Sequence, residues 1–147
     1  MKRDSLARSS EIAPPARSGF LHAFRPRYHE TDQSGIVHHS VYLKWFEDAR
    51  VALFRARGMN FGELERVDRV GMAVHHADVR YKLPARFDDE IEAEVWLGEV
   101  KRATLRFDYR LWRGEELLSE AKISIACIHL DRMRAIRVPD AVRRCCI

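Results

Sequence analysis

The sequence contains no long run of apolar residues. None of its apolar stretches approaches the roughly 18–20 residues that a membrane-spanning helix needs. The N-terminal segment also lacks the apolar h-region of a secretory signal. These absences predict a cytoplasmic protein with no membrane partner.

Cysteine is scarce and poorly placed for cross-linking. The three cysteines are Cys127, Cys145 and Cys146, an odd number with two of them adjacent. This arrangement is a poor basis for a disulfide framework or a zinc site, both of which need suitably spaced cysteines. We therefore expect reduced thiols, no metal and no cofactor.

Glycine and proline are also few, with 7 and 5 copies, while 46% of the residues are apolar and 33% are charged. Such a composition is typical of a folded globular protein. The length of 147 residues fits one domain, since domains commonly contain about 100–200 residues. Residues 1–19 carry two adjacent prolines and no apolar periodicity, which predicts a mobile tail before a folded domain of residues 20–147.

The positive charge of the chain is concentrated at its two ends. The net charge is +4, with +2 in residues 1–19, +4 in residues 132–147 and −2 in between. A nucleic-acid-binding protein more often carries a basic stripe on its folded body. We therefore expect no nucleic-acid partner, although terminal arginines also suit the phosphates of a small ligand.

Hydrophobic periodicity predicts a protein with one long helix and several strands. Apolar residues recur at helical spacing from Val41 to Arg57, with Ser40 as the N-cap and Gly58 as the C-cap. A short helical turn is predicted at residues 61–66. Alternating or continuous apolar residues predict strands at 20–28, 70–83, 89–97, 104–112, 117–130 and 135–138. This order predicts an α+β architecture in which an antiparallel sheet curls around the helix, as in the hotdog fold.

The loop before the predicted helix carries a set of spaced residues. The segment TDQSGIVHHSVYLKWFEDAR, residues 31–50, resembles the signature of the 4-hydroxybenzoyl-CoA thioesterase family, in particular its acyl-CoA thioesterase branch. A second segment, YKLPARFDD at residues 81–89, is similar to that family's connection between two strands. The residues that fill the places of the signature are Asp32, Gly35, Ile36, Val37, His38, His39 and Tyr42.

The resemblance implies a hotdog acyl-CoA thioesterase that forms a homodimer, or a homotetramer of paired dimers. It also implies that the backbone N–H of His39 is the chief donor to the oxyanion. The residues themselves suit this chemistry, because thioester hydrolysis needs a carboxylate near the carbonyl carbon and donors for the developing oxyanion. Asp32 is the predicted nucleophile or general base. Gly35 allows the loop a tight turn and a close approach of the substrate.

Coenzyme A adds phosphates, for which arginine and lysine are the expected partners. Among 21 arginines and 5 lysines we select Arg86, Lys101 and Arg102, the first in the second segment and the others at a predicted hairpin. Tyr42 and His38 are candidate substrate contacts, although aromatic residues at helical spacing more often belong to the core.

Several other interpretations of the same residues stay open. Asp32 also suits a turn. Glu47 is a rival carboxylate on the helix, for which we favour a structural role, exposed or paired with Arg50 or a second subunit. Adjacent histidines on a strand or helix point in different directions, which makes His38 and His39 poor metal ligands. The alternative functions are a hotdog enoyl-CoA hydratase or dehydratase and a non-catalytic acyl-binding or scaffold protein.

Overall fold

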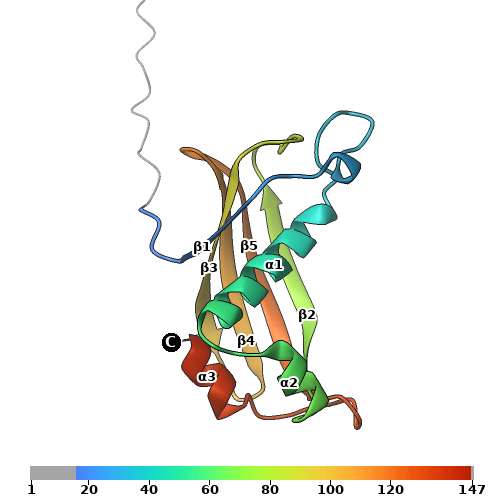
Figure 1. The fold of residues 1–147 in the computed structure, drawn as a ribbon, viewed down its shortest axis with the longest axis vertical. Helices are drawn as coiled ribbons and strands as arrows, with labels where there is room; N and C mark the ends of the chain where they lie inside the picture. Colours follow the sequence, from blue (N-terminus) through green and yellow to red (C-terminus); the bar gives the residue numbers. More distant parts are fainter. Residues whose placement is uncertain (1–15, 147) are drawn as a thin grey trace, which may run out of the picture.

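A computed structural model describes residues 16–146, in which one helix lies across the concave face of a curled antiparallel sheet (Figure 1). The helix is α1 (Val41–Ala56), and the strands follow the order β1-β3-β4-β5-β2, with a short β6 paired to β5. This arrangement confirms the predicted α+β hotdog fold. The strands are β1 (Phe20–Phe24), β2 (Val70–Tyr81), β3 (Ile91–Val100), β4 (Thr104–Arg113), β5 (Glu116–His129) and β6 (Arg134–Ala135).

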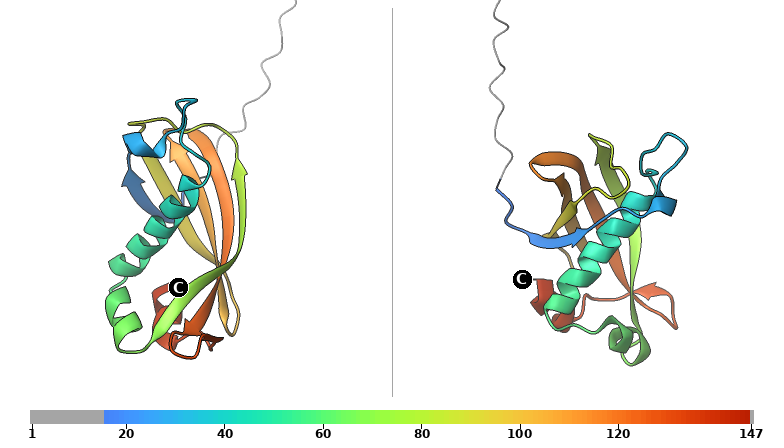
Figure 2. Two further views of the ribbon diagram at one scale, coloured as in Figure 1. Left: turned by 90° about the vertical axis from the view of Figure 1, so that its right-hand side faces the viewer. Right: turned by 45° about the horizontal axis from the view of Figure 1, so that its top comes forward.

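The apolar face of α1 supplies the centre of the core. Trp45 and Phe46 are buried on the helix, and Phe107 and Tyr109 are buried on β4. The ring centroids of Phe46 and Tyr109 are 4.8 Å apart. Fully burying one large apolar side chain contributes roughly 1.5–3 kcal/mol, so this interface fixes the position of the helix on the sheet. The view from the side shows the sheet curving around α1 (Figure 2).

One charged residue of α1 lies inside this core. The guanidinium of Arg50 is buried, and its Nη1 donates a hydrogen bond to the Tyr109 hydroxyl over 3.2 Å. Burial raises the pKa of Tyr109, so the phenol stays protonated. Arg50 makes no ion pair with Glu47 within residues 16–146, and Glu47 is exposed. The exposed position that we expected for Glu47 agrees with the structure, whereas its pairing with Arg50 does not occur.

The ends of several elements differ from the predicted ones. The first strand ends at Phe24 rather than at residue 28, because Pro26 cannot donate to a strand ladder. A 3-10 turn, η1 (Tyr28–Glu30), follows it. The helix α2 (Phe61–Arg66) has the predicted bounds. The terminal helix α3 (Asp140–Cys146) was not predicted, since its burial of Val142 and Cys146 against the domain is a tertiary effect.

The segment just before β1 packs on the outer face of the sheet, although residues 1–19 were predicted to be a tail. Arg17 donates to Glu92, and its guanidinium carbon lies 4.6 Å from the centre of the Trp112 ring. The N–H groups of residues 18 and 19 donate to the Glu94 carboxylate over 2.9 and 3.0 Å. Residues 17–19 therefore belong to the folded body, and residues 1–15 of the predicted tail lie outside the described residues.

Glu94 is the buried acceptor at this site. Its side chain is fully buried, and it accepts a third hydrogen bond from Trp112 Nε1 over 3.2 Å. The Arg110 guanidinium lies 3.8 Å from the same carboxylate. Three hydrogen-bond donors and one guanidinium thus surround this carboxylate, which offsets the cost of removing its charge from water.

The helices of residues 16–146 include none that is long and apolar enough to cross a membrane.

We predict that Glu94→Ala lowers the free energy of unfolding by roughly 3 kcal/mol or more, because it leaves several buried donors without an acceptor. Denaturant titration measures the change. The control is Glu90→Ala, which removes an exposed ion pair with Arg25 just before the same strand, β3, and is expected to cost about 1 kcal/mol or less. Equal losses for the two variants would contradict the role of Glu94.

Candidate active site

The loop that carries Asp32 is closed by its own backbone hydrogen bonds. Thr31 and Val37 form an antiparallel bridge, and the Asp32 N–H donates to the carbonyl of Ile36 over 2.9 Å. The Gly35 N–H donates back to the carbonyl of Asp32 over 3.0 Å, with Gly35 at φ +76°. This left-handed conformation favours glycine. The predicted requirement for a glycine at this turn is confirmed.

The Asp32 side chain serves this turn and is also accessible. Its Oδ1 accepts a hydrogen bond from the Ser34 N–H over 2.7 Å, which makes an Asx turn. Within residues 16–146 the carboxylate makes no other hydrogen bond, and the residue is exposed. One oxygen therefore holds the loop, and the other is open to a water molecule or to a substrate.

The second segment singled out in the sequence lies directly against this loop. The Val37 N–H donates to the carbonyl of Ala85 over 2.8 Å, and both residues are buried. The Ala85 N–H in turn lies 3.3 Å from the hydroxyl of Tyr42 on α1. On the other side of the loop the His38 N–H donates to the carbonyl of Glu30 over 3.0 Å. The structure thus brings together the loop, the start of α1 and the connection after β2.

A backbone N–H is free beside the start of α1. The His39 N–H has no acceptor within the described part of the chain, and His39 is exposed. Its neighbours are all engaged, since the Ser40 N–H donates to His38 Nδ1 and the Val41 N–H donates to the carbonyl of His38. A free N–H at a helix start lies at the positive end of the helix dipole. This group can stabilise an oxyanion.

Ser40 does not cap the helix with its side chain as predicted. Its Oγ lies 2.8 Å from His38 Nδ1 instead, and its backbone is already helical, with φ −68° and ψ −23°. An N-cap side chain reaches the helix N–H groups when the cap residue is extended. The helical backbone of Ser40 explains why its hydroxyl turns to the imidazole.

Aromatic side chains gather around the start of α1. The His38 and His39 rings lie close together, with centroids 4.2 Å apart, and the predicted divergence of these adjacent histidines is wrong. They lie in the turn before α1, where side chains do not follow the directions of a strand or a helix. Among residues 16–146 no group of three His, Cys, Asp or Glu side chains is placed to hold a metal ion.

Tyr42 and Tyr81 complete this group of rings, with centroids 4.9 Å apart. Tyr42 is buried against Trp45, and burial raises the pKa of its phenol. The position of Tyr42 is therefore that of a core residue beneath the site. The Tyr81 hydroxyl donates to the carbonyl of His39 over 2.8 Å. The sequence reasoning missed Tyr81, whose signal was its place at the start of the YKLPARFDD segment.

The three candidate phosphate partners are divided between the two ends of the molecule. Arg86 follows Ala85, is exposed, and lies at the same end as the Asp32 loop. Lys101 and Arg102 lie in the turn between β3 and β4, where their carbonyls accept from Arg143. This turn is at the opposite end of the sheet (Figure 1). Within one chain the structure brings only Arg86 to the site.

The rival carboxylate of Glu47 lies further along α1. It lies six positions after the first residue of the helix, a rise of about 9 Å at 1.5 Å per residue. Its side chain is exposed and makes no hydrogen bond or ion pair within residues 16–146. The Glu47 carboxylate therefore lacks a hydrogen bond that fixes its direction, whereas the Ser34 N–H fixes that of Asp32.

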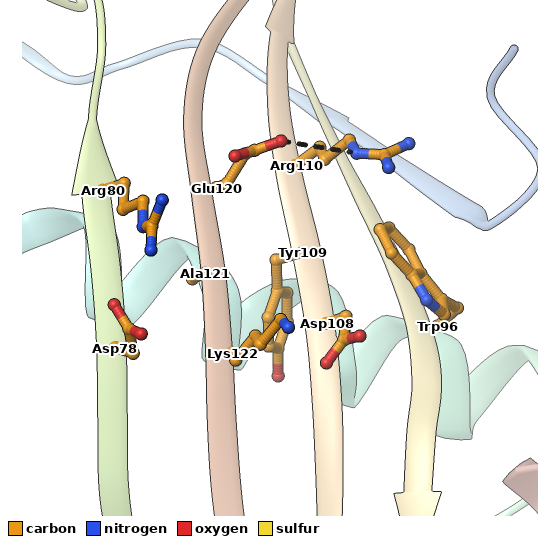
Figure 3. Close-up of a pocket in the computed structure, with 9 residues that line it drawn as sticks. All are labelled: Asp78, Arg80, Trp96, Asp108, Tyr109, Arg110, Glu120, Ala121 and Lys122. Carbon is orange, nitrogen blue, oxygen red and sulfur yellow. Dashed lines mark ion pairs between the residues drawn. The ribbon is translucent and has the colours of Figure 1, made fainter. Parts of the chain in front are cut away.

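A groove of about 320 Å³ lies on the sheet face turned away from α1 (Figure 3). It holds charges of both signs, and the Arg110 guanidinium lies 3.9 Å from the Glu120 carboxylate. The groove contains none of the loop or helix-start residues. Its charged lining residues are Asp78, Arg80, Asp108, Arg110, Glu120 and Lys122, and Trp96 lies beside them.

Known proteins share both the sequence and the fold of this chain. Residues 26–145 match the thioesterase-like superfamily. The acyl-CoA thioesterase YbgC of Haemophilus influenzae is 32% identical over 126 residues, which cover 86% of this chain and 93% of that protein. The acyl-CoA thioester hydrolase YbgC of Escherichia coli is 29% identical over 119 residues, covering 80% of this chain and 88% of that protein.

A solved structure of a hypothetical protein from Thermus thermophilus superposes with a TM-score of 0.79 at 33% identity, over 86% of this chain and 95% of that one. The 1,4-dihydroxy-2-naphthoyl-CoA thioesterase of Synechocystis superposes with a TM-score of 0.80 at 17% identity over 87% and 95% of the two chains, which shows a shared fold.

The chain therefore belongs to the thioesterase-like superfamily, and its enzyme class is that of the thioester hydrolases. The resemblance noted in the sequence is confirmed at the level of this superfamily. Its narrower assignment to the 4-hydroxybenzoyl-CoA thioesterases stays a prediction, since the curated relatives described above are YbgC proteins.

We predict that Gly35→Ala slows thioester hydrolysis whereas Gly58→Ala does not, although both destabilise the protein. Both glycines have a positive φ, +76° and +85°, and an added Cβ meets nothing within 4 Å at either position. The left-handed conformation alone costs an alanine about 1–2 kcal/mol. Melting temperatures are therefore expected to fall similarly, and steady-state kinetics separates the two variants. Equal turnover would contradict a catalytic role for the Asp32 loop.

Proposed function

We propose that this protein hydrolyses acyl-CoA thioesters at the junction between the Asp32 loop and the start of α1. The observation that carries the proposal is the exposed Asp32 carboxylate in the same short loop–helix junction as the free N–H of His39. The YbgC relatives of Haemophilus influenzae and Escherichia coli, which are named as acyl-CoA thioesterases, support the choice of substrate class.

The proposed reaction needs no group beyond the protein and water. The Asp32 carboxylate either attacks the thioester carbonyl to form an anhydride or takes a proton from the water that attacks it. The carbonyl oxygen gains negative charge, which the N–H of His39 stabilises, aided by the helix dipole by about 0.3–1 kcal/mol. The carbon–sulfur bond then breaks and coenzyme A leaves as a thiolate, which takes a proton from protonated Asp32 in the general-base route or from water in the nucleophilic route. In the first route, water hydrolyses the anhydride and restores the carboxylate.

The Asx turn at Asp32 fits this role because it leaves one oxygen open. An asparagine preserves the turn, since its Oδ1 also accepts from the Ser34 N–H. The substitution removes the negative charge that either route needs. It therefore separates the chemical role of Asp32 from its structural role.

We predict that Asp32→Asn lowers turnover by about 10²-fold or more, while acyl-CoA binding and the melting temperature stay close to those of the wild type. Release of free thiol measures turnover, and calorimetric titration of the slow variant measures binding. Glu47→Gln is the parallel variant and is expected to keep its activity. Full activity of Asp32→Asn, or a large loss of turnover in Glu47→Gln, would overturn the assignment of Asp32 as the reacting carboxylate.

Arg86 is the proposed phosphate contact at this end of the molecule. Its backbone is anchored, because its N–H donates to Asp89 Oδ2 over 2.8 Å. The Arg113 guanidinium also donates to Asp89 Oδ2 over 2.8 Å, and this bond stabilises the connection. The Arg86 side chain is exposed, and no protein partner within residues 16–146 occupies it. An exposed guanidinium on such an anchored backbone can pair with a phosphate of coenzyme A.

We predict that Arg86→Ala raises KM for acyl-CoA roughly 5- to 10-fold with little change in kcat, since it removes one charge-assisted contact with a remote part of the substrate. The control substrate is the matching acyl-N-acetylcysteamine thioester, which has no phosphates and should show no such change. Equal effects on both substrates would show that Arg86 acts through the loop structure instead.

We extend the proposal to a homodimer or homotetramer. β2 is an edge strand of the sheet, and Val74 and Tyr81 along it are partly exposed apolar residues. Exposed apolar residues along an unpaired strand edge favour pairing with another strand. We propose that in such a homo-oligomer Lys101 and Arg102 of one subunit contact the phosphates of a substrate bound at the site of another.

A further inference from the structure

Hydrogen bonds hold both peptide groups that flank the α-carbon of His39. The carbonyl of His38 accepts the Val41 N–H over 3.0 Å. The carbonyl of His38 and the N–H of His39 belong to one planar peptide group and point in opposite directions. The bond to Val41 therefore sets one limit on the direction of the free N–H.

The second limit comes from another part of the chain. The Tyr81 hydroxyl donates to the carbonyl of His39 over 2.8 Å, across 42 residues of sequence. This carbonyl lies in the peptide group on the other side of the His39 α-carbon. With both flanking peptides bonded, the backbone of His39 has little freedom to rotate, although it precedes the helix and is exposed.

We propose that Tyr81 is a positioning residue that aims the N–H of His39 at the developing oxyanion. The inference rests on the proposed function, because it gives the free N–H its role. Donors in an oxyanion hole are effective when they are oriented before the reaction, so that no reorganisation is needed in the transition state. The hydroxyl of Tyr81 supplies that orientation and does not touch the reacting atoms.

The surroundings of Tyr81 keep its hydroxyl in place. Its ring packs edge-on against Tyr42 and His39, with interplanar angles of 78° and 89°. Tyr81 is the last residue of β2 and pairs with Ser119 of β5, which is buried and donates to the carbonyl of Arg80 over 2.7 Å. Partial burial also raises the pKa of Tyr81 above its usual value, so the phenol stays a donor at neutral pH.

Two substitutions at Tyr81 distinguish the role of its hydroxyl from that of its ring. Tyr81→Phe removes the hydrogen bond and keeps the ring contacts, whereas Tyr81→Leu removes both. We expect kcat to fall about 10- to 100-fold in both variants, since a small displacement of a catalytic group can cost up to about 10²-fold. KM is expected to change less than about threefold, because substrate binding does not depend on the oxyanion contact.

The matched control is Tyr28→Phe. Tyr28 lies in η1 near the same loop, is 77% exposed, and its hydroxyl makes no hydrogen bond within residues 16–146. This variant should keep the wild-type kcat and KM. Melting temperatures of all variants show whether a loss of activity follows a loss of stability.

The outcomes distinguish the inference from the function on which it rests. A Tyr81→Phe enzyme with wild-type kcat, while Asp32→Asn is inactive, would overturn the positioning role and leave the thioesterase assignment intact. A slow Tyr81→Leu beside a fully active Tyr81→Phe would assign the effect to ring packing and would also overturn it. A wild-type protein that releases no thiol from any acyl-CoA would instead refute the proposed function itself.

Discussion

The packing of α1 against the concave face of the sheet is the interaction on which the rest of the structure depends. The helix carries its aromatic face into the sheet, where Phe46 meets Tyr109. Because both partners are fully buried, the helix cannot slide or rotate without opening a cavity in the core. The first turn of α1 is therefore held at one end of the sheet, and this fixes the position of the residues that precede it.

The candidate site is built on this fixed helix start by short backbone hydrogen bonds. Val37 bonds to Ala85 on one side of the Asp32 loop, and His38 bonds to Glu30 on the other. The loop can therefore stay exposed and still be ordered, as the catalytic role proposed for it requires. The packed helix and sheet hold the exposed groups of the loop in fixed positions, which lets a carboxylate and an N–H act together.

The two faces of the sheet have different tasks. The inner face is apolar and covers α1, whereas the outer face carries charges of both signs around the groove seen in Figure 3. Glu94 is the exception on the outer face, because Trp112 and the backbone of residues 18 and 19 enclose it. This buried carboxylate ties the segment before β1 to the sheet and extends the folded body beyond the range that periodicity indicated.

The sequence by itself determined the fold class, the helix from Val41 and the turn at Gly35, because each depends on a local period or a local backbone requirement. The motif in residues 31–50 also predicts Asp32 and His39 as residues of the site. The tertiary structure alone decided which distant residues share the site. It placed Tyr81 on the carbonyl of His39, kept Arg86 beside the loop, and put Lys101 and Arg102 at the far end of the sheet. Contacts across 42 residues depend on strand pairing and on the curl of the sheet, and no local pattern in the chain records them.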